Sequence, residues 1–196
     1  IKMIKIGLTG SIGMGKSETA KIFQELGFPV YDADSSVHKL YGKDQKGAAA
    51  VKKFFPAALS SDGSVDRKIL SDTVVGDKNK LKILESISHP LLVEDRELFF
   101  EKNKSLKAVV LDIPLLFETG GQINVDYTVV VFTSYEIQKK RVLVRKNMSE
   151  EKFKKIISLQ LPSADKCARA DFIIDTSVSI DDAKKQVKNI ILSIGI

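Results

Sequence analysis

The residues best suited to chemistry lie near the N-terminus, where residues 10–17 match the pattern G-x-x-x-x-G-K-[ST] of a phosphate-binding loop. Glycines let the backbone of such a loop curl until its N–H groups point at an anion. Lys16 would place a cation against the β- and γ-phosphates of a nucleotide, and the Ser17 hydroxyl would bind Mg²⁺. The predicted nucleotide-binding residues of the loop are Ser11, Ile12, Gly13, Met14, Gly15, Lys16 and Ser17.

The flanking sequence predicts the elements that position this loop. Residues 3–9 alternate in the manner of a β-strand. After the loop, apolar residues with helical spacing run from Ala20 to Leu26, and Gly27 is a suitable helix end. A strand, a loop and a helix in this order form the context in which the motif binds phosphate, because the helix N-terminus also attracts anions.

Three carboxylates follow predicted strands and could serve phosphoryl transfer. Asp32 and Asp34 come after the strand at 29–32, and on an extended segment they would point to one side. One could accept a proton from an acceptor hydroxyl while the other stays near a metal; the alternative is a helix cap. Asp112 ends an apolar strand, where it could hold Mg²⁺ through water, or it initiates a turn before Pro114.

Basic side chains in the C-terminal half could neutralise the charge of a transferred phosphoryl group. Arg141 and Arg145 are four residues apart, which predicts one shared helical face, and a solvated basic face is the alternative. Arg169, placed in a loop after Pro162, could reach adenine or phosphate. His89 is either a helix-entry residue or a substrate contact, and without a Cys/His cluster no zinc site is expected.

Composition limits the class of protein. The 196 residues, 43% hydrophobic and 29% charged, suit one α/β domain with a small insertion. A net charge of +6 fits an anionic ligand. Since neither a transmembrane segment nor a signal peptide is recognisable and Cys167 is the single cysteine, we expect a cytoplasmic protein without a membrane partner.

The order of predicted elements favours a parallel sheet wrapped by helices, with strands at 3–9, 29–32, 108–112, 127–132 and 172–175. Residues 35–103 show no strand pattern, and we expect helices there at 48–55, 69–75, 80–87 and 90–100, the last with Pro90 in its first turn. Further helices are expected at 136–146, from Ser149, and from Ser179, which has capping-box spacing to Asp182. We predict one domain, 1–196, with a nucleotide-binding core (1–34 and 105–196), a mainly helical substrate-binding insertion (35–104) and a helical lid (136–162).

In its motifs, nearly the whole chain resembles the dephospho-coenzyme A kinase family. The ordered pieces that carry the resemblance are L-T-G-x-I-G-x-G-K-S at 8–17, D-A-D at 32–34, H-P at 89–90, D-I-P-L-L-F-E at 112–118, Gln138 with Arg141 and Arg145, Q-L-P at 160–162 and A-R-A-D at 168–171. Residues 176–178, Thr-Ser-Val, depart from an Asn-Ser-Gly-like turn of the family.

The resemblance implies a P-loop fold with a CoA-binding helical insertion and a lid, and ATP-dependent phosphorylation of the ribose 3′-hydroxyl of dephospho-CoA. It also implies ATP and Mg²⁺ as cofactors. Lys39 and Arg67 are candidate contacts of pantetheine or phosphate. The resemblance implies Asp34 as catalytic base with Lys16 and Arg141 as catalytic cations, Ser17 toward the metal, and His89 with the 112–118 segment toward the acceptor. Together with the residues considered above, the predicted metal ligands are Ser17, Asp34 and Asp112, and the predicted ATP contacts outside the loop are Arg141, Arg145 and Arg169. The predicted acceptor contacts are Thr9, Asp34, His89, Leu115, Leu116 and Phe117.

Two other functions share parts of this pattern. A nucleoside or nucleoside-monophosphate kinase has the same core and lid, and differs in its acceptor. A nucleic-acid-associated NTPase would use the positive charge, but the basic residues lack interleaved aromatic residues and tryptophan is absent. We therefore expect small-molecule substrates, no nucleic-acid partner, and a monomer or small homo-oligomer.

Overall fold

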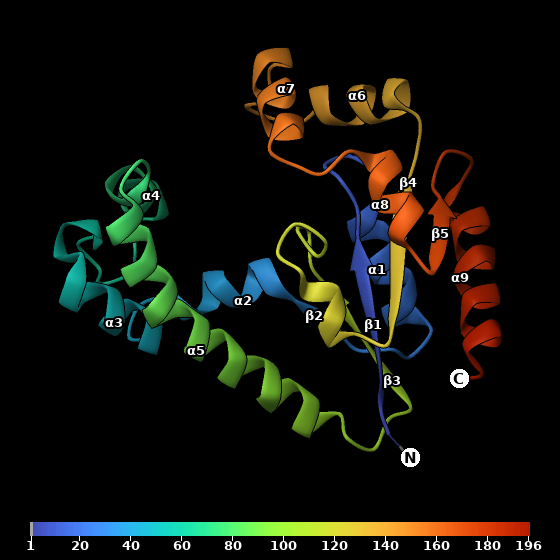
Figure 1. Ribbon diagram of the computed structural model, residues 1–196, viewed down its shortest axis with the longest axis horizontal. Coiled ribbons are helices and arrows are strands. Elements are labelled where there is room, and N and C mark those ends of the chain that lie inside the picture. The colour runs from blue at the N-terminus through green and yellow to red at the C-terminus, as the bar shows by residue number, and fades with distance from the viewer. Residues whose placement is uncertain (1) are drawn as a thin grey trace. The chain divides into compact units, whose positions relative to one another are not determined.

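A computed structural model describes residues 2–196, which divide into two compact units (Figure 1). The first, here called the core unit, contains the chain up to Tyr31 and from Asn103 onward. The second, the helical unit, is Asp32–Lys102.

The core unit is built on a five-stranded sheet in the order β2-β3-β1-β4-β5. Strand β1 pairs in parallel with both β3 and β4, and β4 pairs in parallel with β5. All of β3 and most of β4 are buried, which explains their continuous apolar sequence. The strands, close to their predicted positions, are β1 (Ile4–Thr9), β2 (Val30–Asp32), β3 (Ala108–Asp112), β4 (Tyr127–Phe132) and β5 (Phe172–Asp175).

Helices cover this sheet and complete its core. Ile6, Leu8 and Val129 of the sheet pack with Phe23 of the first helix and Val187 of the last. The last helix begins where its capping box predicts, since the Ser179 hydroxyl accepts a hydrogen bond from the Asp182 N–H. The helices are α1 (Lys16–Glu25), the 3₁₀ turn η2 (Gly121–Asn124), α6 (Tyr135–Leu143), α7 (Glu150–Ser158), α8 (Ser163–Arg169) and α9 (Ile180–Ile194).

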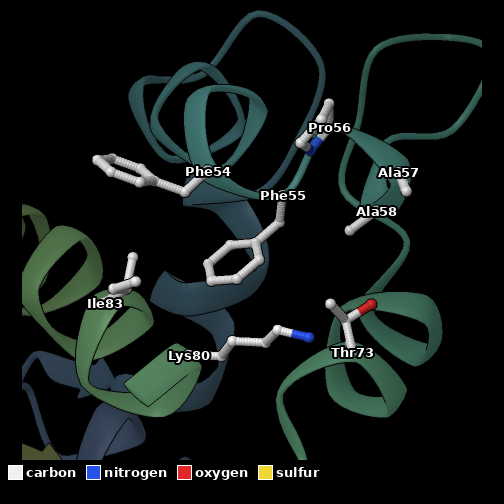
Figure 2. Close-up of a pocket in the computed structure, with 8 residues that line it drawn as sticks. All are labelled: Phe54, Phe55, Pro56, Ala57, Ala58, Thr73, Lys80 and Ile83. Carbon is white, nitrogen blue, oxygen red and sulfur yellow. The ribbon is translucent and has the colours of Figure 1, made fainter. Parts of the chain in front are cut away.

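The helical unit has its own small apolar core, made of residues such as Val51, Ala58 and Leu70. A cavity of about 370 Å³ is lined by apolar groups of Phe54, Phe55 and Ile83, together with polar Thr73 and Lys80 (Figure 2). Its elements are α2 (Ala33–Leu40), α3 (Lys46–Phe54), the 3₁₀ turn η1 (Pro56–Ala58), α4 (Arg67–Val74) and α5 (Lys78–Lys102).

The prediction of two helices separated at Pro90 is wrong, because Pro90 lies inside the continuous helix α5. A proline inside a helix removes one main-chain hydrogen bond and costs about 3 kcal/mol. Helix α5 packs along α3 and α4, and this tertiary packing outweighs the local penalty.

Two further predictions concerning arginines are wrong. Helix α6 ends at Leu143 rather than 146, and the chain turns through Asn147, whose φ is +61°. Arg145 therefore lies beyond the helix and does not share a helical face with Arg141. Arg169 is not in a loop but ends α8, which begins directly after Pro162.

We predict that Phe23→Ala lowers the free energy of unfolding by about 3–5 kcal/mol, because it leaves a cavity where a fully buried ring packs between α1 and the sheet. Urea denaturation of both proteins measures the difference. Leu192→Ala on α9 is the matched control, since Leu192 is 74% exposed. An equal effect of the two substitutions would contradict this view of the core.

Candidate functional site

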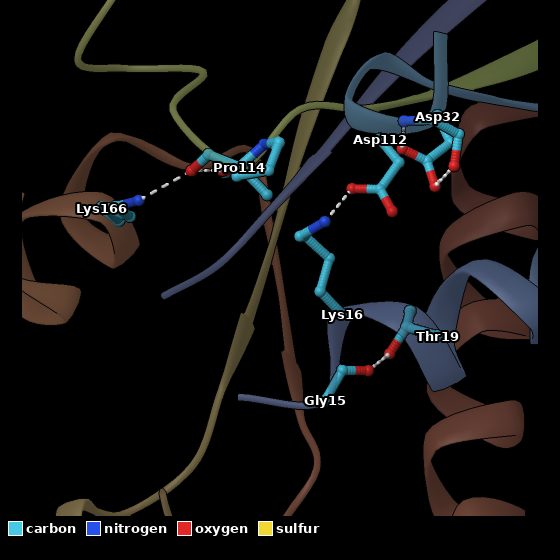
Figure 3. Close-up of polar contacts among 9 residues, drawn as sticks. Gly15, Lys16, Thr19, Asp32, Asp112, Pro114 and Lys166 are labelled. Carbon is cyan, nitrogen blue, oxygen red and sulfur yellow. Dashed lines mark hydrogen bonds and ion pairs between the residues drawn. The ribbon is translucent and has the colours of Figure 1, made fainter. Parts of the chain in front are cut away.

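The glycine-rich loop lies between β1 and α1 in the core unit. Gly13 and Gly15 have φ values of +77° and +96°, in the left-handed region that glycine tolerates. The loop is closed by a bond from the Met14 N–H to the Ser11 carbonyl at 3.2 Å, and the Thr19 hydroxyl bonds the Gly15 carbonyl (Figure 3). The first N–H groups of α1, at Lys16 and Ser17, have no intrahelical acceptor and can bind an anion.

Close packing explains two of the loop glycines. A Cβ on Gly10 would lie 2.3 Å from Val131 Cγ2 of β4, and one on Gly13 would lie 2.5 Å from Val142 Cγ2 of α6. Both distances are shorter than atoms can approach. The loop therefore rests directly on β4 and α6, and no larger side chain fits without movement.

Lys16 and Asp112 form an ion pair, in which the lysine ammonium donates to the carboxylate (Figure 3). Asp112 lies at the end of β3, and in the sheet register it stands beside Leu8 of β1, just before the loop. Only 7% of the Asp112 side chain and 18% of the Lys16 side chain are exposed. The apolar strand thus brings a buried carboxylate to the phosphate loop, at the edge where the parallel strands end. The sequence predicted a magnesium ligand or a turn residue at Asp112, and the pair with Lys16 was not predicted.

Two glutamines bind the main chain of Ile12 within the loop. The Gln138 side-chain amide of α6 donates to the Ile12 carbonyl at 2.7 Å. The Gln160 side-chain oxygen, between α7 and α8, accepts from the Ile12 N–H at 3.2 Å. Both glutamines belong to the motifs that carry the family resemblance, but their hydrogen bonds to the loop were not predicted.

Arg141 is held beside the same loop through Thr176. Its guanidinium donates to the Thr176 hydroxyl at 2.9 Å and to the Thr176 carbonyl at 2.6 Å. The Thr176 hydroxyl in turn donates to the Met14 carbonyl at 2.7 Å. Thr176 directly follows β5, so the turn that departs from the family pattern carries the contact with Arg141.

A second polar cluster fixes the segment after β3. Lys166 of α8 is fully buried and donates to the Pro114 carbonyl at 3.2 Å (Figure 3). Its ammonium also pairs with the Glu118 carboxylate at 2.9 Å. The Pro114 carbonyl also accepts from the Thr9 hydroxyl at 3.1 Å. Burial raises the pKa of Glu118, but hydrogen bonds from Lys166 and the Leu161 N–H outweigh it, and the net pKa is lowered. No pattern in the sequence marked Lys166 as a buried residue, because a lysine is rarely buried unless it is paired.

The structure places the remaining core-unit residues as follows. Leu115 is 40% exposed, whereas the side chains of Leu116 and Phe117 are buried and could reach an acceptor only through their main chain. Ser11 is buried, and its hydroxyl bonds that of Ser163. Arg145 and Arg169 are exposed. The loop, Lys16, Asp112 and Arg141 therefore form the cluster that the structure brings together.

Asp34 and His89 belong to the helical unit. Asp34 is exposed in the first turn of α2, and His89 is exposed on α5. The expectation that Asp32 and Asp34 alternate on an extended segment is wrong, because Asp32 is the N-cap of α2 and accepts from the Ser35 N–H at 2.9 Å. The alternative of a helix cap is thus confirmed for Asp32.

Residues 2–196 contain no cluster of three or more His, Cys, Asp or Glu side chains able to hold a metal ion. In the same range, every helix is too short or too polar to span a membrane.

The parallel sheet, with a phosphate loop leading into α1 and a buried acid at the end of the neighbouring strand, defines a P-loop kinase. A family model described as dephospho-CoA kinase matches residues 4–182. The chain belongs to this family.

Individual relatives agree with the family assignment. A dephospho-CoA kinase of Rhodopseudomonas palustris (strain HaA2) is 47% identical over 96% of this chain and 94% of its own length. The crystal structure of TT1252 from Thermus thermophilus is 30% identical, with a TM-score of 0.87 over 100% of both chains. A dephospho-CoA kinase from Campylobacter jejuni is 30% identical, with a TM-score of 0.64 over 97% of this chain and 96% of that one.

We predict that the Lys166–Glu118 pair makes the core unit sensitive to acid. Since the folded-state pKa of Glu118 is lowered, the pair stabilises the fold above the unfolded value near 4.5, and this contribution is lost as the pH falls through the folded-state pKa. Glu118→Gln should cost about 3–5 kcal/mol at pH 7, because it leaves the Lys166 ammonium buried without a counter-charge.

Urea denaturation between pH 3 and pH 7 measures both effects. The double substitution Lys166→Met with Glu118→Leu should cost less than Glu118→Gln alone, because no charge stays buried. Equal acid sensitivity of the wild type and the Glu118→Gln variant would contradict the assignment of the pKa.

Proposed function

We propose that this protein transfers the γ-phosphoryl group of ATP to the ribose 3′-hydroxyl of dephospho-CoA, giving coenzyme A and ADP, the final step of coenzyme A synthesis. The observation that carries the choice of acceptor is membership of the dephospho-CoA kinase family across residues 4–182. The phosphate loop with its Lys16–Asp112 pair supports the class of reaction.

In this proposal the loop binds the triphosphate through main-chain N–H groups and through Lys16. The ammonium of Lys16 exchanges Asp112 for the β- and γ-phosphates. Arg141, held beside Met14 by Thr176, adds positive charge to the nucleotide side, where it stabilises the negative oxygens of the transferred group. Ser11, Arg145 and Arg169 are further candidate contacts of ATP.

The donor set of the core unit fits Mg²⁺. The Ser17 hydroxyl and the Asp112 carboxylate are hard oxygen ligands, and Mg²⁺ is usually bound by one or two carboxylates together with substrate phosphates. A bound Mg²⁺ would neutralise charge on the phosphates. Asp34 is the third candidate ligand.

We assign Asp34 as the group that receives the acceptor proton. The 3′-hydroxyl loses its proton to the carboxylate, its oxygen bonds the γ-phosphorus, and the bond from that phosphorus to the bridging oxygen of ADP breaks. Asp34 is solvent-exposed in the first turn of α2, so its carboxylate is accessible to an incoming hydroxyl.

The helical unit is the proposed acceptor-binding part of the chain, with His89 and the exposed cations Lys39 and Arg67 as contacts. Thr9 and residues 115–117 are the proposed acceptor contacts of the core unit, and residues 136–162 form the proposed lid. The reaction needs neither a membrane nor a nucleic acid. We place it in the cytoplasm, in a monomer or small homo-oligomer.

We predict that ADP release from Mg-ATP depends on dephospho-CoA, and that the product carries one added phosphate at the 3′ position. Coupled ADP detection, mass spectrometry and phosphorus NMR measure rate, mass and position. Lys16→Ala should abolish most of the turnover because it removes the cation of the loop. Turnover with AMP, CMP or UMP but not with dephospho-CoA would overturn the proposal in favour of a nucleoside-monophosphate kinase.

We predict that Asp34→Asn lowers kcat by about 10²–10⁴-fold, because the amide cannot accept the proton. The affinity for ATP should stay within about twofold, because Asp34 is assigned to the acceptor proton and to the metal and makes no assigned contact with ATP. Asp72→Asn, another exposed aspartate of the helical unit, is the matched control. Unchanged turnover of Asp34→Asn would remove the assignment of Asp34 and leave the rest of the proposal intact.

A further inference from the structure

The two glutamines that bind Ile12 act on two successive peptide groups of the phosphate loop. Gln160 accepts from the N–H of the Ser11–Ile12 peptide, and Gln138 donates to the carbonyl of the Ile12–Gly13 peptide. A trans peptide is planar, and its carbonyl and N–H point in opposite directions. The bond from Gln138 therefore also fixes the direction of the Gly13 N–H, which must point away from α6.

The Gly13 N–H is available for a ligand. Within residues 2–196, no group accepts a hydrogen bond from it, although Gly13 itself is buried. The Met14 N–H and the Ile12 N–H, its neighbours, are both used inside the chain. A buried main-chain donor without a partner is costly, and a bound phosphate oxygen would satisfy it.

Two observations indicate that Gln138 holds this geometry firmly. The residue is only 3% exposed, and its bond to Ile12 is 2.7 Å long. Gly13 also packs directly on the helix that carries Gln138, since a Cβ there would lie 3.1 Å from the Gln138 carbonyl oxygen and 2.5 Å from Val142 Cγ2. Neither the helix nor the peptide can turn without moving the other.

We propose that Gln138 is a positioning residue of the phosphate loop, which aims the Gly13 N–H at a phosphate oxygen of the bound nucleotide beyond the α-phosphate. Gln160 supports it by fixing the preceding peptide. The proposal rests on the proposed function, since it assigns a further determinant of the same nucleotide site. It concerns the nucleotide alone and does not depend on which acceptor is phosphorylated.

The test is the affinity of variants of the whole 196-residue chain for ATP, ADP and AMP, measured by isothermal titration calorimetry. Gln138→Leu keeps the size of the side chain and removes the donor, so ATP and ADP should bind at least about tenfold more weakly. AMP, which lacks the β- and γ-phosphates, should change by less than about twofold. Gln24→Leu on α1 is the matched control, because Gln24 is exposed and its side chain has no bond.

Gln160 gives a second test that needs no change at Gln138. Gln160→Leu removes the acceptor of the Ile12 N–H, so the affinity for ADP should fall more than the affinity for AMP. Gln160→Glu keeps the acceptor oxygen. Gln160→Glu should therefore retain the melting temperature that Gln160→Leu loses. Thermal denaturation of every variant separates a local effect from a general loss of the fold.

Each outcome decides one question. If the folded variants Gln138→Leu and Gln160→Leu lose affinity equally for ATP, ADP and AMP, the positioning role is overturned. A merely structural effect would lower the three affinities alike, whatever the number of phosphates. Affinities like those of Gln24→Leu would overturn it as well. A wild type that binds none of the nucleotides would instead overturn the proposed function, and a wild type that binds them but transfers phosphate only to nucleoside monophosphates would overturn its acceptor alone.

Discussion

A phosphate loop has to present main-chain N–H groups to an anion, and the groups that precede α1 belong to no strand or helix that could hold them in place. In this chain the constraint is met by side chains from distant parts of the sequence. Gln138, Gln160 and Thr176 bind the carbonyls or N–H groups of Ile12 and Met14. Helix α6 carries Gln138, Gln160 lies just before α8, and Thr176 directly follows β5. The loop conformation therefore depends on the positions of these three elements.

The same region shows how charge is kept inside a mostly apolar sheet structure. The edge where the parallel strands end contains two cationic groups of low exposure, Lys16 and Lys166, and each has its own carboxylate. An unpaired ammonium there would be strongly unfavourable, whereas a paired one is tolerated and fixes local geometry. Lys166 holds the segment after β3 through Pro114, and Thr9 at the end of β1 binds the same carbonyl. The two neighbouring strands are thus joined beyond their last ladder bonds.

Sequence patterns predicted the features that depend on local or periodic order. The apolar runs at 108–112 and 127–132 are buried strands, and residues 10–15 form the loop between β1 and α1, with Lys16 and Ser17 opening the helix. Features set by tertiary contact could not be predicted. The partners of Ile12 lie 126 and 148 residues away in the sequence, and a glutamine carries no pattern that names its partner. The prediction of a helix start at Pro90 was wrong for the same reason, since packing of α5 against α3 and α4 overrides the local preference of proline for the first turn.

The ion pair of Lys16 with Asp112 has a consequence for how the loop recognises anions. A free lysine side chain loses conformational entropy worth about 2 kcal/mol when it is immobilised. Here the Lys16 side chain is already ordered on folding by its pair with Asp112, so a ligand exchanges one ionic partner for another and does not have to order a mobile side chain. An anion must then offer the ammonium more than the carboxylate does. A small, weakly charged anion attracts the ammonium less than the Asp112 carboxylate does, whereas a polyphosphate attracts it more. Competition from Asp112 therefore makes the loop selective for highly charged anions.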